Sequence, residues 1–214
     1  MIHDQIDTVD ALFDPKYKGK IGMPEDPQEL GSIGLNAIGV HPADSTFDDW
    51  KRAADKLKEQ KPLVHAYKGQ PYITDLKNGD TVISWCWSGD IFQANLNSKY
   101  RDLKLVFAKE GAMFWTDNMC IPVGVENPVS AMTFMDYVYD PHVQALIEDY
   151  NAYVCPVPAA KSIIANDLKD PAVANSPTVF PDEQQVALSK PYYQFKGSQD
   201  LDQWNKTFEP IFTG

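Results

Sequence analysis

An aromatic residue and a carboxylate stand two positions apart within the stretch from Lys109 to Pro122. If this stretch is a strand, alternation with a period of two places Met113, Trp115 and Asp117 on one face. An indole face attracts a cation and packs against methylene groups, while a carboxylate neutralises the charge and accepts its hydrogen bonds. The pair therefore fits an organic cation. The same spacing is also typical of a half-buried strand residue beside a solvated one.

A second pair of carboxylates lies where a short strand, 21–23, is followed by a helix. Asp26 is placed to cap that helix, Pro27 suits its first position, and Glu29 lies in its first turn. Corners between a strand and a helix are common ligand-facing positions in α/β folds. Asp26 and Glu29 are therefore candidate ligand contacts, and capping or interaction with the helix dipole is compatible with that role.

A buried strand is predicted over 81–87, because its residues are apolar and β-branched and a turn follows at 88–90. Ligands bind at the carboxyl ends of strands in open α/β sheets, so Trp87 is a better site candidate than Trp85. A helix is expected after the turn, to about Lys99, and another strand over 103–108. The order of elements from 14 to 122 thus alternates β and α, which predicts a three-layer α/β lobe.

The clearest helix is 45–60, with Ser45 as its cap, Asp48 at the capping-box position and Trp50 in the core. Caps at Asn127 and Asp140, each followed by proline, predict a helical hairpin. Residues 150–158 are expected to be extended and to cross between lobes. Further helices are predicted at 27–38, 72–77 and 200–212, with short helices between 159 and 192.

The composition is that of a globular protein: 214 residues, 43% hydrophobic, with a net charge of -11. The acidic balance argues against nucleic acid, which needs a basic face, and suits either a cationic ligand or simple solubility. No apolar run is long enough to span a membrane, and the first residues lack the pattern of a signal peptide. Cys86, Cys120 and Cys155 form no CxxC pattern; Cys120 and Cys155 either pair in an oxidising compartment or are buried free thiols.

The sequence contains no motif for catalysis. It has no GxSxG, HExxH, P-loop or GxGxxG pattern, and its four histidines have no neighbouring nucleophile pattern. We therefore predict a binding protein rather than an enzyme, with no metal and no cofactor.

Several separated stretches resemble one family. They are Leu12 to Ile21, Glu25 to Glu29, Ser84 to Phe92, Lys109 to Pro122, Asn127 to Val143 and Val179 to Asp182. In this order the chain resembles the polyamine-binding (spermidine/putrescine) proteins of bacterial ABC importers, which belong to the extracellular solute-binding proteins with the type II periplasmic-binding fold. The resemblance implies an α/β protein with one largely complete three-layer lobe and a partial second lobe.

The resemblance also implies a binding site. Members of this family hold the polyamine between two lobes, with aromatic walls and with carboxylates for the ammonium groups. The matching positions are the carboxylates Asp26, Glu29 and Asp117, the aromatic walls Trp87, Trp115 and Tyr153, and Gln194, where the spacing differs by about two residues. A cationic amine, an amino acid or a sugar stacked on the tryptophans is the alternative ligand, and a sensor module that keeps the fold without transport is a further alternative.

The resemblance implies that part of the family fold is absent before Leu12. Residues 14–111 and 154–214 then form the C-terminal lobe, 114–153 a remnant of the N-terminal lobe, and 1–13 a lead-in. Ile121, Val123 and the helical hairpin should expose apolar surface unless the missing N-terminal segment or a second copy covers it. An ABC permease is the implied membrane partner, and the implied location is periplasmic or extracellular, with or without a lipid anchor.

Overall fold

Three short parallel strands form the main sheet, in the order β2-β1-β3. They are β1 (Ile21–Met23), β2 (Val64–Tyr67) and β3 (Ile83–Ser84) in a computed structural model that describes residues 5–96 and 103–214. Gly22 of β1 is in register with Ala66 on one side and Ser84 on the other. A Cβ atom on Gly22 would lie 2.5 Å from Ser84 Oγ, so glycine permits the close pairing of β1 with β3.

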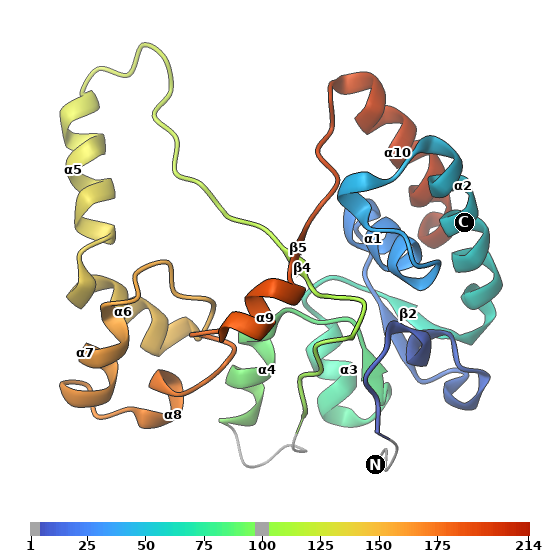
Figure 1. Ribbon diagram of the computed structural model, residues 1–214, viewed down its shortest axis with the longest axis horizontal. Coiled ribbons are helices and arrows are strands. Elements are labelled where there is room, and N and C mark those ends of the chain that lie inside the picture. The colour runs from blue at the N-terminus through green and yellow to red at the C-terminus, as the bar shows by residue number, and fades with distance from the viewer. Residues whose placement is uncertain (1–4, 97–102) are drawn as a thin grey trace.

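Three helices pack together beside this sheet: α1 (Pro27–Ala37), α2 (Phe47–Gln60) and α10 (Ser198–Thr213) (Figure 1). Trp204 and Phe208 of α10 are fully buried, and Trp50 of α2 is 2% exposed, as predicted for a core residue. The Trp204 indole donates from Nε1 to the Pro27 carbonyl at a distance of 2.8 Å. The first turn of α1 is thereby fixed to α10.

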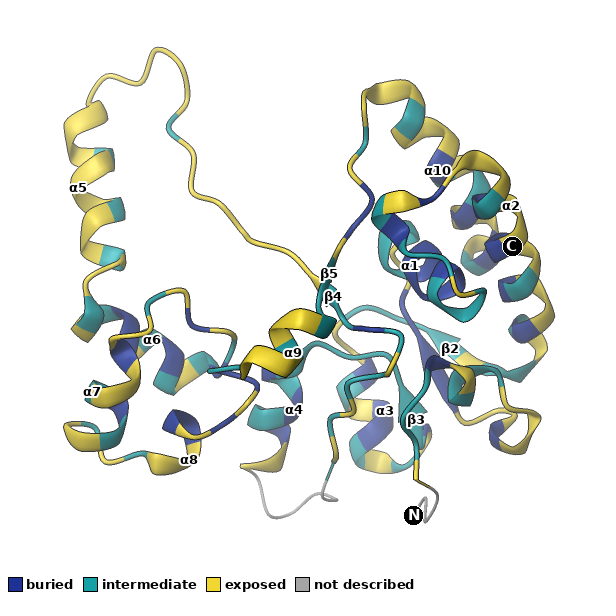
Figure 2. Ribbon diagram, viewed as in Figure 1, coloured by how far each residue is buried: buried dark blue, intermediate teal, exposed yellow. Residues whose placement is uncertain are grey.

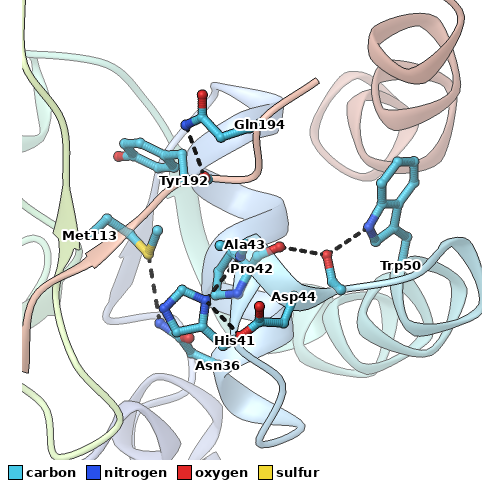
Figure 3. A network of polar contacts seen from close by, with 10 residues as sticks. Asn36, His41, Pro42, Ala43, Asp44, Trp50, Met113, Tyr192 and Gln194 are labelled. Atoms are coloured by element: carbon cyan, nitrogen blue, oxygen red, sulfur yellow. Dashed lines mark hydrogen bonds and ion pairs between the residues drawn. The ribbon is translucent and has the colours of Figure 1, made fainter. Parts of the chain in front are cut away.

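The cap of α2 lies one residue later than the sequence suggested. Thr46, not Ser45, is the N-cap, and it forms a reciprocal capping box with Asp49 rather than Asp48. Ser45 instead ends the short 3₁₀ helix η3 (Pro42–Asp44), and its Oγ accepts from Trp50 Nε1 at 2.9 Å (Figure 3). The buried Trp50 indole needs a hydrogen-bond acceptor, and the Ser45 hydroxyl provides it.

A second group of elements follows the sheet. These are α3 (Tyr72–Asn78) and α4 (Ser88–Asn95), whose buried residues Tyr72, Leu76 and Ile91 form a small core cluster. The expected end of α4 near Lys99 lies outside the described residues. The lead-in contains the 3₁₀ helices η1 (Val9–Phe13) and η2 (Pro15–Tyr17), and η4 (Lys61–Leu63) precedes β2.

Three predicted strands are shorter than expected or absent. The buried strand expected over 81–87 is reduced to β3, whose two residues are only half-buried. Residues 103–108 form no strand, because within the described chain no ladder pairs with them. Of the stretch 109–122, only β4 (Met113–Phe114) is a strand; it pairs in parallel with β5 (Lys190–Pro191). Gly111 (φ 103°) turns the chain into β4, where a Cβ atom would lie 2.3 Å from the Leu188 carbonyl oxygen.

The helical hairpin is present with the predicted caps. It consists of α5 (Pro128–Val138), capped by Asn127, and α6 (Pro141–Asn151), capped by Asp140. Because α6 continues to Asn151, the extended segment begins later than the predicted residue 150. The short helices α7 (Ala160–Asn166), α8 (Pro171–Ala174) and α9 (Glu183–Leu188) follow, as expected between 159 and 192.

The helix α5 of the hairpin is largely exposed (Figure 2), and many of the exposed side chains of the hairpin are apolar. α5 has no buried residue, and Val129 and Phe134 are 65% and 61% exposed. Val123 is fully exposed, as expected, whereas Ile121 is only partly exposed. The core of this part is formed by α6, α7 and α8 around Ile164 and Val173.

Candidate functional site

The first turn of α1 presents two carboxylates at the end of β1. Asp26 Oδ1 accepts from the backbone N–H groups of Gln28 and Glu29, at 2.8 and 2.9 Å, which confirms the predicted cap. Its side chain is nevertheless exposed, so the cap leaves the carboxylate accessible to a ligand. Glu29 is half-buried one turn into the helix.

Glu29 is held by Trp87. The Trp87 indole donates from Nε1 to Glu29 Oε1 at 3.0 Å, although 58 residues separate them. Burial is the main cause that raises the pKa of Glu29 to about 7; the hydrogen bond from Trp87 lowers this pKa, and the negative charge of Asp26 contributes to the rise. The site therefore holds a carboxyl group that is close to half-ionised at neutral pH.

Two tyrosines and Asp90 fix the aromatic walls. Tyr72 donates to one oxygen of Asp90 at 2.8 Å, and Tyr153 donates to the other at 3.0 Å. Tyr72 also accepts from the Trp87 backbone N–H, at 3.0 Å. The ring of Tyr153 packs on Gly89, where a Cβ atom would lie 2.4 Å from the ring. Trp87 and Tyr153 are thus positioned through α4, which carries Gly89 and Asp90.

The segment after β4 supplies the opposite side. Trp115 is 43% exposed, and its ring lies 5.8 Å from that of Tyr192, tilted by 49°. Asp117 is exposed. The predicted alternation fails here: Phe114, Thr116 and Asn118 line the same pocket as Trp115 and Asp117, whereas Met113 does not. The reason is that the strand ends at Phe114, so the following residues have no fixed sheet faces.

Gln194 reaches the site from the segment that follows β5. Its amide donates from Nε2 to the Tyr192 carbonyl at 3.3 Å (Figure 3). Nearby, the amide of Asn36 on α1 contacts the sulfur of Met113 at 3.9 Å. Tyr192 is buried, and burial together with the charges of Glu29 and Asp26 raises its pKa. It therefore stays neutral at physiological pH.

All seven predicted site residues line one pocket of about 790 Å³. The volume falls within the range of small-molecule sites. Three of these residues are carboxylates, and no basic residue is present among the described residues that line the pocket. Sequence reasoning missed its other members, which are Gln28, Gln70, Phe114, Thr116, Asn118, Pro191 and Tyr192. Of these, the aromatic pair before Gln194 was a signal that could have identified Tyr192.

The described residues contain no group of three or more His, Cys, Asp or Glu side chains arranged to hold a metal ion. No helix among them is both long and apolar enough to cross a bilayer. The three cysteines are free, and Cys120 is exposed rather than buried, while Cys155 is buried.

Comparisons with known proteins agree on one family. The sequence pattern described as bacterial extracellular solute-binding protein matches residues 2–181. The spermidine/putrescine-binding periplasmic protein of Escherichia coli is 26% identical over 175 residues, which are 82% of this chain and 48% of that protein. The putrescine/cadaverine-binding protein of Pseudomonas aeruginosa is 29% identical over 204 residues, 91% of this chain and 56% of that protein. The chain spans about half the length of the curated relatives it matches.

Solved structures show the same α/β fold. A Listeria monocytogenes protein, whose name places it in spermidine/putrescine ABC transport, superposes with a TM-score of 0.84 at 25% identity. The match covers 98% of this chain and 62% of that one. A Streptococcus pneumoniae structure gives a TM-score of 0.81 at 22% identity and covers 99% and 63% of the two chains, respectively. The predicted α/β class is confirmed, and the strand pairs in both sheets are parallel.

Proposed function

We propose that this chain, which belongs to the bacterial extracellular solute-binding protein family, forms one side of a polyamine site in the substrate-binding component of an ABC importer. Proteins of this family bind solutes and do not transform them. The observation that carries the proposal is the convergence of three carboxylates and three aromatic side chains on one pocket. An elongated cation with ammonium groups joined by methylenes matches this combination.

Each part of the pocket has a role in this proposal. Asp26 and Glu29, which lie together at the first turn of α1, and Asp117, which follows β4, pair with ammonium groups. Trp87, Trp115 and Tyr153 pack against the methylenes and attract positive charge through their faces. The side-chain amide of Gln194 supplies a further polar contact to the ligand. The names of the relatives, which include spermidine, putrescine and cadaverine binding, support the same ligand class.

The arrangement of the chain supports a two-lobe receptor. We propose that 14–111 and 154–214 form one lobe and that 114–153 belongs to the other, with 1–13 as a lead-in. The pocket draws residues from both parts, since Trp115, Asp117 and Tyr153 belong to 114–153 and the other lining residues, Asp26 and Glu29 among them, belong to 14–111 and 154–214. Delivery to a membrane permease from the periplasmic or outer side follows from this assignment, in line with the periplasmic names of the relatives.

Titration calorimetry tests the proposal. Putrescine, spermidine, arginine and a neutral sugar are titrated into this chain joined to the part of the Escherichia coli relative that it does not match. We expect saturable binding of a polyamine that weakens as salt rises, because the contacts are between charges. Binding that prefers the sugar and ignores salt would move the ligand to a neutral class, and preference for arginine would move it to cationic amino acids.

A further inference from the structure

Two buried polar side chains on α6 are only partly paired. Gln144 and Glu148 are each 4% exposed. Gln144 donates from Nε2 to the Val138 carbonyl at the end of α5, at 2.9 Å, but no described group pairs with its Oε1. Glu148 Oε2 is also buried and has no partner among the described residues. Buried polar atoms in native proteins are nearly always hydrogen-bonded, so these two oxygens need a donor.

The spacing of the two residues makes them neighbours. They are four positions apart on one helix, which places their side chains on the same face with Cβ atoms about 5–6 Å apart. While Glu148 is ionised, both oxygens only accept hydrogen bonds, so they cannot pair with each other. A proton on Glu148 turns its carboxyl group into a donor, and one hydrogen bond then satisfies both oxygens.

The surroundings of Glu148 disfavour its charged form. Ala145 and Ala152, about one turn away on either side, belong to an apolar cluster with Ile164 of α7 and Val173 of α8. These helices pack together in one part of the molecule (Figure 1). Burial raises the pKa of Glu148 to about 7, and no cation among the described groups offsets this effect.

The ionisable groups of the neighbouring elements are engaged elsewhere or exposed. Lys161 of α7 lies over the Phe180 ring, 5.5 Å from its centroid. Asp170 caps α8, and burial together with the charge of Asp170 raises the pKa of Asp149. Burial, and to a smaller extent the charge of Glu148, raises the pKa of the Cys155 thiol. The other ionisable side chains of α5, α6 and α7 and of the turns that follow α5 and α7 are exposed: Asp136, Tyr137, Tyr139, Asp140, His142, Tyr150, Asp167 and Lys169.

We propose that Glu148 is a protonation switch at the end of α6: its carboxyl group holds a proton below neutral pH, donates it in a hydrogen bond to Gln144 Oε1, and releases it to solvent above neutral pH. The hydrogen bond extends the contact from Gln144 to the Val138 carbonyl, so the end of α5 is tied to the last turn of α6. Release of the proton leaves a buried charge without a partner, which loosens that turn.

The last turn of α6 leads directly into the crossing segment. The Ala152 N–H donates to the Glu148 carbonyl at 2.8 Å, and Ala152 ends the helix in the left-handed conformation with φ of 56°. Because the folded-state pKa of Glu148 lies above its unfolded value of 4.5, the stabilisation is complete below pH 4.5 and is lost as pH rises through 7. The inference concerns α6 and does not depend on the identity of the solute.

Carbon NMR of the isotope-labelled full chain detects the proton directly. The carboxyl carbon of Glu148 and the side-chain carbonyl carbon of Gln144 are assigned through their bonded carbons and followed from pH 4 to pH 9. We expect Glu148 to titrate near pH 7, and the Gln144 carbon to shift with the same midpoint, because its oxygen loses the hydrogen bond there. A Glu148 midpoint at or below pH 5, or a Gln144 signal that does not follow it, would assign the missing donor to a buried water and overturn the inference.

Glu148→Gln provides a second measurement, because its amide can donate to Gln144 at every pH. Hydrogen exchange at the Ala152 amide is compared between wild type and variant at the same pH, so that the intrinsic exchange rate and the titration of Glu29 cancel. Exchange should be equal at pH 5.5 and at least about tenfold faster in the wild type at pH 8.5. Glu209→Gln, at an exposed position of α10, is the control and should behave as the wild type does. Equal exchange in the wild type and Glu148→Gln at pH 8.5 would overturn the inference, as would equal protection by both substitutions.

Discussion

Asp26 serves two purposes that one substitution can separate. Its side chain caps α1 and, in the proposed site, pairs with an ammonium group. Asparagine is as good an N-cap as aspartate but carries no charge. Asp26→Asn should therefore leave the free energy of unfolding within about 0.5 kcal/mol of the wild type. In this chain joined to the unmatched part of the Escherichia coli relative, it should weaken polyamine binding about tenfold, the loss expected for one charge-assisted contact.

The control for this variant is Asp202→Asn on α10, which is exposed and lies outside the pocket. It changes the net charge by the same amount. If the two substitutions change the polyamine affinity equally in calorimetry, Asp26 acts only through the net charge of the protein.

Trp115 and Asp117 test the opposite side of the pocket. Trp115→Ala removes an aromatic face worth about 0.5–2 kcal/mol to a cation, which corresponds to a roughly 2- to 30-fold loss of affinity. Asp117→Asn should also weaken binding, and more at low salt than at high salt. Tyr150→Ala, at a residue that is 85% exposed on α6, is the control. Unchanged affinity in both pocket variants would exclude this segment from the site.

Glu29 should make binding depend on pH. Its pKa of about 7 in the empty site means that it is largely protonated at pH 6, whereas a bound cation favours the ionised form. Binding must then release a proton below pH 7. Affinity should fall by up to about tenfold between pH 7.5 and 6, and it should level off above pH 7.5.

Glu29→Gln keeps an acceptor for Trp87 and removes the titration. Calorimetry across this pH range, in buffers of different ionisation enthalpy, should show a flat profile and no proton release for the variant. An unchanged slope would assign the pH dependence to another group.

The same raised pKa has a consequence for folding. Because the folded-state pKa of Glu29 lies above its unfolded value of 4.5, the protonated form is favoured in the native state. The resulting stabilisation is complete below pH 4.5 and is lost as pH rises through 7. Ligand affinity and this part of the folding stability thus change in opposite directions with pH.

Local signals in the sequence identified several of these residues. The order Asp-Pro at 26–27 predicted the cap and so placed Asp26 and Glu29 at the corner. Tyr192 and Pro191 were missed because they join the pocket through the pairing of β4 with β5, which lie 75 or more residues apart. No local pattern encodes the pairing of β4 with β5, and the aromatic pair before Gln194 is the local signal that could have identified Tyr192.

At the scale of elements, the packing of α1 against α10 holds the acidic corner in place. A Cβ atom on Gly31 would lie 2.4 Å from the Trp204 ring and 2.8 Å from the Phe208 ring. Gly31→Ala should lower the free energy of unfolding by about 1–3 kcal/mol through overpacking, despite the better helix propensity of alanine. Urea denaturation measures this change.

Gly197→Ala is the matched control, because nothing lies within 4 Å of its Cβ position and its backbone is extended. It should change the stability little. If Gly31→Ala is neutral or stabilising, the two helices are less tightly packed than the structure shows.

Helices could be predicted from the sequence more fully than strands. The caps at Asn127 and Asp140 are local signals, and both helices begin at the next residue. A strand depends on a neighbour for its hydrogen bonds, and residues 103–108 have none among the described residues. The sequence of 103–108 alone was therefore insufficient to form a strand.

At the scale of the whole molecule, α5 and α6 leave apolar surface uncovered. Val129, Phe134 and Leu146 are each at least 60% exposed, and α5 has no buried residue. The isolated chain should bind a hydrophobic dye and associate as its concentration rises. Joining the unmatched part of a relative should reduce dye fluorescence, because the proposed two-lobe arrangement packs the hairpin within the second lobe. Equal fluorescence in both forms would contradict the two-lobe assignment.

The most direct test of the polyamine site is titration with putrescine and spermidine at low and high salt. It compares this chain alone with the same chain joined to the part of the Escherichia coli relative that it does not match. The account predicts saturable binding by the joined form only, weaker at high salt and weakened further by Asp117→Asn. Binding by neither form, or binding that neither salt nor Asp117→Asn changes, would contradict it.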